Sequence, residues 1–132
     1  CNYVYRGATH TRFEHCVGTA HLAERLVVTL QQQQPYLRIT QRDKLCVKLA
    51  GLCHDLGHGP FSHVFDAQFM PEMRARNNRR DKWSHEQASV QMLDYLLEDS
   101  NINLEDFGLK PQEDIPFIKD MILGTPERTS KR

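Results

Sequence analysis

Apolar residues recur at intervals of three and four along most of this chain, which is the spacing of one face of an α-helix. The pattern predicts four main helices: from Thr11 to about Gln32, from Thr40 to before Gly57, from Ser84 past Leu97 and from Pro111 to Gly124. Only residues 3–5 alternate as a strand would. We therefore predict an all-α fold, a partial helical bundle of about four main helices plus short turns.

Local signals at the helix ends support these bounds. Thr11 and Glu14 have the spacing of a capping box, in which each side chain accepts the other residue's backbone amide, and Ser84 and Gln87 repeat that spacing. The first helix should end before Pro35, because the residue before a proline avoids the helical conformation.

Two internal segments and the tail fit these helices less clearly. Residues 62–69 suggest a short helical turn that buries Phe65 and Phe69. Residues 71–82 lack apolar periodicity, so we predict an exposed loop there. Residues 125–132 are predicted to be a frayed tail.

Composition limits the class of protein. The 132 residues include 17 basic and 17 acidic side chains, and this zero formal charge argues against a chain built mainly to coat nucleic acid. No apolar run reaches the roughly 18 residues of a membrane span, so we expect no membrane partner. The four cysteines lack CxxC spacing, which favours a reducing compartment, cytoplasmic or nuclear. Because the sequence does not begin with Met, we expect a piece of a longer protein.

Candidate chemistry is concentrated in residues 53–63, CHDLGHGPFSH. His54 and Asp55 are adjacent, so on a helix their side chains diverge by about 100° and can reach one ion from two directions. Imidazole and carboxylate are ligands for zinc, iron or manganese. His15 and His85 add candidates on other predicted helices. Any single histidine could instead cap a helix, but the group as a whole favours a functional site.

These residues carry a family resemblance. His15 followed by the His54-Asp55 doublet resembles the HD superfamily of metal-dependent phosphohydrolases. The match is closer to the animal deoxynucleoside triphosphate (dNTP) triphosphohydrolases that combine SAM and HD domains. It extends from about Asn2 to Gly124, and we interpret residues 1–124 as a partial HD domain. Its motifs are YVY at 3–5, GATH at 7–10, RFEH at 12–15, AGLCHDLGHGPFSH at 50–63 and WSHEQ at 83–87.

The resemblance implies a metal site. His15, His54 and Asp55 would be three ligands of a divalent metal: iron, manganese or zinc, and/or magnesium. The family's fourth ligand is an aspartate in a later helix. The surroundings of Asp114 and Asp120 do not match it, so we expect the sequence to stop before that ligand and this piece alone to be inactive.

The resemblance also implies a reaction and its residues. The family cleaves dNTPs between the α-phosphorus and the 5′ oxygen, releasing a deoxynucleoside and inorganic triphosphate. Asp66 and His85 would form a catalytic pair, and His63 would be the general acid or a phosphate contact. Arg12 and His58 would bind the substrate's phosphates.

Regulation is implied in the same way. The family forms homotetramers assembled by GTP or dNTP activators, and it is nuclear or cytoplasmic. Val4 and Tyr5 match the segment that touches one regulatory nucleotide, although Tyr5 and Arg6 stand where the family has Phe and Pro.

Two other functions compete with this interpretation. Another HD hydrolase would act on cyclic nucleotides or on alarmones like guanosine tetraphosphate. A module for single-stranded nucleic acid would use a basic loop at residues 74–82, whose cations are Arg74, Arg76, Arg79, Arg80 and Lys82. A solvated loop is the simpler interpretation of that segment.

Overall fold

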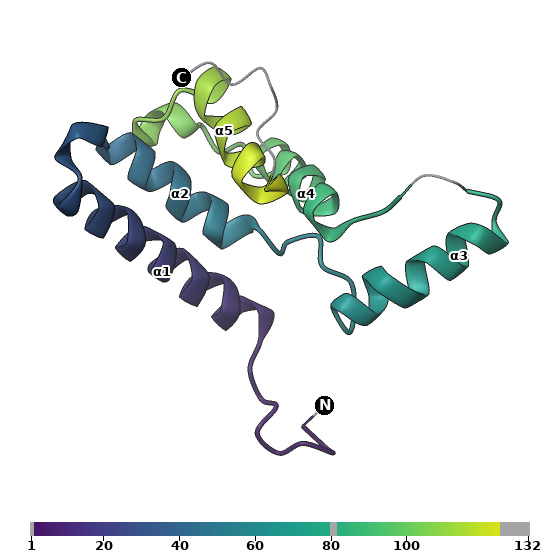
Figure 1. The fold of residues 1–132 in the computed structure, drawn as a ribbon. Coiled ribbons are helices and arrows are strands. Elements are labelled where there is room, and N and C mark those ends of the chain that lie inside the picture. The colour runs from purple at the N-terminus through teal and green to yellow at the C-terminus, as the bar shows by residue number, and fades with distance from the viewer. Residues whose placement is uncertain (1, 80–81, 125–132) are drawn as a thin grey trace. The chain divides into compact units, whose positions relative to one another are not determined.

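A computed structural model describes residues 2–79 and 82–124 of the protein (Figure 1). Within those ranges it contains five α-helices and no strand, which confirms the all-α prediction. The four longest are the four predicted: α1 (Arg12–Gln33), α2 (Gln41–Cys53), α4 (His85–Asp99) and α5 (Pro111–Leu123). Residues 2–4 form a turn instead of the strand-like stretch. Among the described residues, no helix has both the length and the apolar character needed to cross a bilayer.

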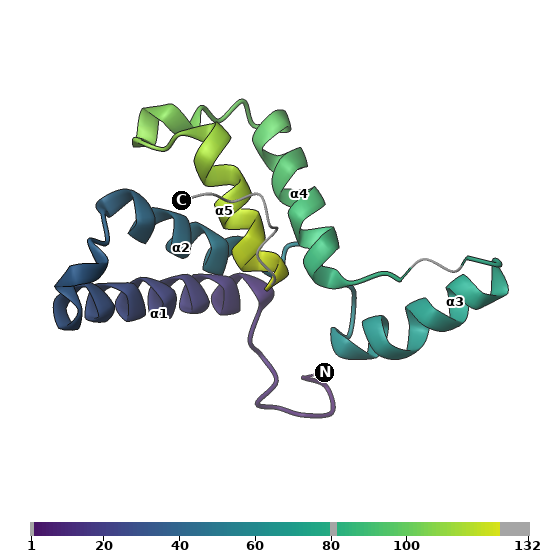
Figure 2. The same cartoon turned by 45° about the horizontal axis from the view of Figure 1, so that its top comes forward.

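The chain divides into two compact units between Leu52 and Cys53. In the first unit, α1 and α2 lie side by side in both Figure 1 and Figure 2. A Cβ atom added at Gly51 of α2 would lie 3.2 Å from both the Cα of Ala20 and the Cβ of Ala23 in α1, so the two helices approach closely there. The short helix η1 (Pro35–Leu37) connects them.

Two reciprocal caps start these helices. The Thr11 side chain accepts a bond from the Glu14 amide while Glu14 Oε2 accepts the Thr11 amide at 2.8 Å, which confirms the predicted capping box. Thr40 and Asp43 do the same before α2, with the Thr40 amide 2.8 Å from Asp43 Oδ2. Helix starts therefore follow from side chains three residues apart.

In the second unit, α4 and α5 pack together (Figure 2). Leu93, Ile118 and Ile122 are buried, and Lys119 Nζ lies 2.6 Å from Asp94 Oδ1 across the pair. On α4, Leu96 is 40% exposed and does not belong to the core. The short helix η3 (Leu104–Phe107) lies between the two helices in the sequence.

The segment before α4 corrects two predictions. One turn of π-helix, η2 (Phe65–Phe69), leads directly into α3 (Met70–Arg76), so the prediction of a loop over 71–82 is wrong for residues 71–76. Phe65 is half-buried, but Phe69 is 50% exposed and was wrongly predicted to be buried. The segment MPEMRAR is helical because its residues favour helix and Pro71 lies in the first turn, where a proline is tolerated. The predicted frayed tail, 125–132, lies outside the described residues.

Candidate active site

The turn that follows α2 carries the glycine–histidine motif, and two glycines fix its path. A Cβ atom on Gly57 would lie 2.3 Å from the backbone of Ala88 and of Ser89 in α4. The Gly57 amide donates to the buried Ser89 hydroxyl at 2.9 Å. A Cβ atom added at Gly59 would lie 2.2 Å from the ring of Phe65. The glycines therefore let this turn lie directly against α4 and η2.

The backbone of the same turn is strained. Phe61 and Ser62 both adopt the left-handed region, with φ of 63° and 51°. This conformation is unfavourable for side chains larger than glycine, and strained residues of this kind cluster at functional sites. The Phe65 amide donates to the Ser62 carbonyl at 2.9 Å, so the strained pair leads straight into the segment that carries Asp66.

Asp66 and His85 form a short polar contact in this unit. His85 Nδ1 lies 2.5 Å from Asp66 Oδ2, and both side chains are mostly buried, at 17% and 16% exposure. Because an ionised carboxylate can only accept, the proton of this bond belongs to the histidine nitrogen. The structure thus brings together the two residues that the resemblance pairs, one from η2 and one from the first turn of α4.

Two further histidine rings, those of His58 and His63, lie around this pair. His58 is stacked on His85 with ring centroids 4.1 Å apart and planes 6° from parallel. His63 meets both rings edge-on, at 5.4 Å from His58 and 5.9 Å from His85. His58 Nδ1 also lies 4.0 Å from Asp66 Oδ1. We call His58, His63, Asp66 and His85 the histidine cluster.

Glu86, the residue after His85, also borders the histidine cluster and was not predicted from the sequence as a site residue. Its Oε1 lies 3.3 Å from His85 Nε2, so both nitrogens of that ring face carboxylate oxygens. Burial disfavours the charged form of Glu86. Hydrogen bonds from its own amide and from Ser84, and the nearby His85 and His58, outweigh burial and lower the pKa of Glu86. Direct adjacency to His85 was the available signal.

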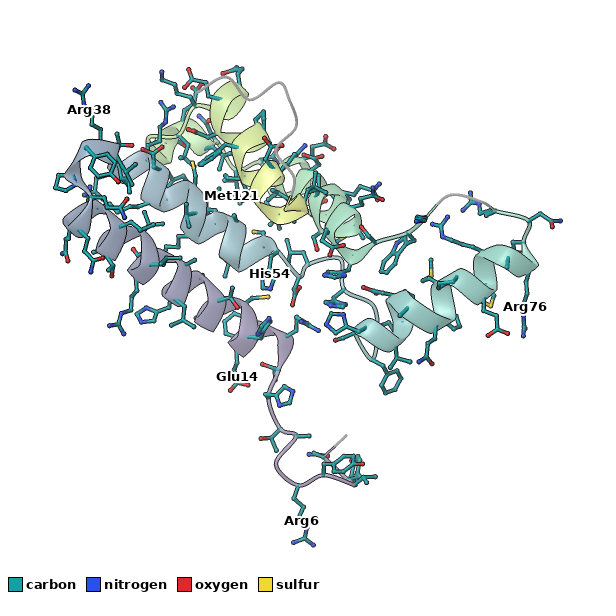
Figure 3. All side chains as sticks on the ribbon, in the orientation of Figure 1. Arg6, Glu14, Arg38, His54, Arg76 and Met121 are labelled. Carbon is teal, nitrogen blue, oxygen red and sulfur yellow. The ribbon has the colours of Figure 1, made fainter. Side chains whose placement is uncertain are left out.

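Carboxylates and imidazoles in this unit also meet at distances suited to a metal. Asp55, His58 and His85 each offer a ligand atom within 4.8 Å of the others, and so do His58, His63 and Asp66. Asp55 is buried, and its Oδ1 lies 3.3 Å from Nε2 of the neighbouring His54 (labelled in Figure 3).

Four predicted site residues lie in the other compact unit. Arg12 and His15 occupy the first turn of α1 and are exposed. Val4 and Tyr5 precede that helix and are 77% and 70% exposed. Their proposed roles, and the ligand set of His15 with His54 and Asp55, stay predictions.

Asp114 has a structural role. It is fully buried, and its Oδ2 accepts the Lys110 amide at 2.7 Å at the start of α5. This bond caps the backbone at the start of α5.

The helical fold and the histidine-carboxylate site define the class of protein. The chain matches the HD domain over residues 12–116 and belongs to that family.

Full-length relatives extend the comparison. The chain is 52% identical over 126 residues to a Mus musculus protein named deoxynucleoside triphosphate triphosphohydrolase SAMHD1, covering 94% of this chain and 18% of the relative. The Homo sapiens protein of that name is 52% identical over 127 residues, 95% of this chain and 20% of the relative. A Dictyostelium discoideum homolog is 37% identical over 123 residues, 93% and 22% respectively. The chain therefore spans about a fifth of the length of these curated relatives.

An HD domain implies a divalent metal, and the residues present fit one. The second unit alone supplies a buried carboxylate, Asp55, with imidazoles of His58 and His85 within ligand spacing. Neutral imidazole and carboxylate oxygen suit first-row divalent ions.

Proposed function

We propose that the full-length protein hydrolyses dNTPs to a deoxynucleoside and inorganic triphosphate. The observation that carries this proposal is the buried contact between Asp66 and His85, stacked on His58 and flanked by His63. A positioned histidine–carboxylate pair is what proton transfer at a phosphoryl group requires. The names of the mouse and human relatives support the substrate class.

The residues of the histidine cluster have distinct proposed roles. Water attacks the α-phosphorus, the bond from phosphorus to the 5′ oxygen breaks, and the leaving alkoxide takes a proton. His63 is the exposed member of the cluster, so it can reach the substrate and donate that proton or contact phosphate. Asp66 holds His85 through Nδ1 and thereby fixes the ring on which His58 stacks. His58 and Arg12 would contact the phosphates.

We propose His15, His54 and Asp55 as metal ligands, with iron, manganese or zinc, and/or magnesium as the ion. When bound, such an ion polarises the phosphoryl oxygens and promotes ionisation of water. The contact between His54 and the buried Asp55 supports this assignment, because it aims two different ligand types at one place.

Further proposals concern the whole protein. We propose that residues 1–124 are part of its HD domain, that GTP or dNTP activators assemble a homotetramer, and that the protein is nuclear or cytoplasmic. The exposure of Val4 and Tyr5 suits contact with a regulatory nucleotide.

Product analysis tests the proposed reaction. The full-length protein is incubated with dGTP and divalent metal, and the products are separated by anion exchange. Deoxyguanosine with inorganic triphosphate is the expected pair, and a chelator should abolish both. Release of pyrophosphate or of a monophosphate would contradict the proposal and favour another HD phosphohydrolase.

A further inference from the structure

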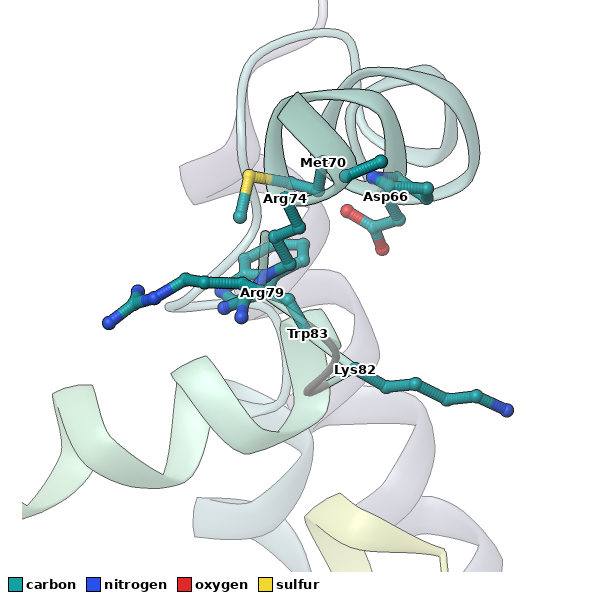
Figure 4. Close-up of a pocket in the computed structure, with 8 residues that line it drawn as sticks. Asp66, Met70, Arg74, Arg79, Lys82 and Trp83 are labelled. Carbon is teal, nitrogen blue, oxygen red and sulfur yellow. The ribbon is translucent and has the colours of Figure 1, made fainter. Parts of the chain in front are cut away.

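A pocket of about 410 Å³ lies beside η2 and α3, and of the proposed catalytic residues only Asp66 lines it. Its lining includes three cations, one tryptophan and one carboxylate, together with apolar side chains such as Met70: the first five are Arg74, Arg79, Lys82, Trp83 and Asp66 (Figure 4). All of these residues belong to the second compact unit. The pocket is therefore formed within one unit.

The end of α3 brings two of the cations together. Asn78 adopts the left-handed region, with φ of 53°. Its amide donates to the Ala75 carbonyl at 3.1 Å, and the Arg79 amide donates to the Arg74 carbonyl at 2.8 Å. This is the pair of bonds that defines a Schellman cap, and asparagine is the best residue after glycine for its left-handed position. The cap turns the chain back so that Arg79 joins Arg74 at the pocket.

The wall and inner end of the pocket are also fixed by contacts. The Trp83 ring is half-buried and meets Phe65 edge-on at 5.4 Å, which holds the indole in place. Asp66 directs its carboxylate toward the pocket in Figure 4, while its Oδ2 is bonded to His85. The pocket thus has an aromatic wall, an acceptor at one end and cations around it.

We propose that this pocket binds a nucleotide, with the base against Trp83 and the phosphates on Arg74, Arg79 and Lys82. Stacking of a base on an aromatic ring contributes roughly 1–3 kcal/mol, and guanidinium groups suit phosphate oxygens. Asp66 would accept from an N–H group on the edge of the base. The volume falls within the ~300–1,000 Å³ of small-ligand sites, so the pocket fits one nucleotide better than it fits a strand. This site shares Asp66 with the histidine cluster, but nucleotide binding here does not depend on the proposed hydrolysis.

Tryptophan fluorescence gives a direct test, because Trp83 is the only tryptophan in the chain. The 132-residue chain, its fold checked by circular dichroism, is titrated with ADP in the presence of EDTA, so that no metal draws phosphate to the histidine cluster. We expect saturable quenching by ADP, and weaker binding of adenosine alone and of pyrophosphate alone.

Variants locate the ligand. Arg79→Gln and, separately, Lys82→Gln should each weaken ADP binding about tenfold, the effect of losing one charged hydrogen bond. The matched control is Arg76→Gln. Arg76 lies on the same helix, is exposed, pairs with Glu72 at 2.6 Å and does not line the pocket (Figure 3). The Arg76→Gln variant should change the affinity for ADP by less than about twofold, because salt screens exposed charges.

Four results would overturn the proposal. They are no saturable effect of ADP, equal losses in the Arg79 and Arg76 variants, loss of binding in His63→Ala, and binding of a (dT)12 oligonucleotide without binding of ADP. The third would place the ligand at the histidine cluster, and the fourth would favour a surface for single-stranded nucleic acid.

Discussion

The turn after α2 and the turn after α3 both contain left-handed residues other than glycine, but they do different things. Phe61 and Ser62 lie between His58 and His63, where the polar side chains contact one another and Asp66. After α3, Asn78 turns the chain so that cations line an open pocket. The turn after α2 holds polar side chains in contact with one another, which suits catalysis. The second arranges charges around a volume that a ligand can fill.

The largest effect is expected from a change in the histidine cluster. Asp66→Asn removes the charge that holds His85, and we expect dNTP hydrolysis by the full-length protein to fall by about 10²–10⁴-fold. Asp99→Asn is the matched control, because Asp99 is an exposed aspartate at the end of α4. Steady-state release of triphosphate measures both variants. Equal activity in the two would remove the catalytic role from the pair.

The second largest effect is expected on stability, from a change in the packing of the turn after α2 against α4. Gly57→Ala places a Cβ atom 2.3 Å from the α4 backbone, so something must move, and we expect a loss of about 1–3 kcal/mol in the free energy of unfolding. Gly18→Ala is the control: nothing lies within 4 Å of an added Cβ inside α1, and removing a helical glycine should stabilise by roughly 0.5–1 kcal/mol. Urea unfolding measures both. Similar values would show that the turn does not lie against α4.

A smaller effect is expected at the end of α3. Asn78→Ala puts a less suitable residue in the left-handed position and should cost about 1 kcal/mol, while Asn78→Gly should restore or exceed the original stability. Neither variant should change dNTP hydrolysis. A loss of hydrolysis in a folded Asn78→Ala variant would show that the two turns are coupled.

The smallest effect is a pH dependence at Glu86. Its pKa in the folded protein is lowered below the ordinary value of about 4.5, so ionised Glu86 stabilises the fold at higher pH. That contribution is lost as the pH falls below about 4.5 and through the folded pKa. The difference in unfolding free energy between the parent and Glu86→Gln should therefore shrink as the pH is lowered from 6 toward ~3. A difference that stays constant over this range would argue against the contacts of Glu86.

The helices could be predicted because their signals are local. Three helix starts are predicted by residues within a few positions of one another: Thr11 with Glu14, Ser84 with Gln87, and Pro111. Each of these helices begins where it was expected. Helix α3 was missed because it buries no continuous apolar stripe. Its exposed residues favour helix individually, and Arg76 pairs with Glu72 one turn earlier.

The site was predictable only in part. The residue types in the motif at 53–63 indicated a metal site. The contact between Asp66 and His85, however, joins residues 19 positions apart and depends on the path of the chain from η2 to α4. This pair was predicted only from the family resemblance, because the spacing of apolar residues along the chain does not indicate such a contact. Ser89 was missed for the same reason, because its contact with Gly57 exists only in the fold.

The central claim is that the histidine cluster serves hydrolysis at the α-phosphorus. Its most direct test is the reaction of full-length protein with dGTP in ¹⁸O-labelled water, followed by mass spectrometry of both products. We predict one ¹⁸O atom in inorganic triphosphate, none in deoxyguanosine, and formation of the labelled triphosphate about 10²–10⁴-fold more slowly by Asp66→Asn. Label in the deoxynucleoside, or formation of labelled triphosphate by Asp66→Asn at the rate of the parent protein, would contradict the account.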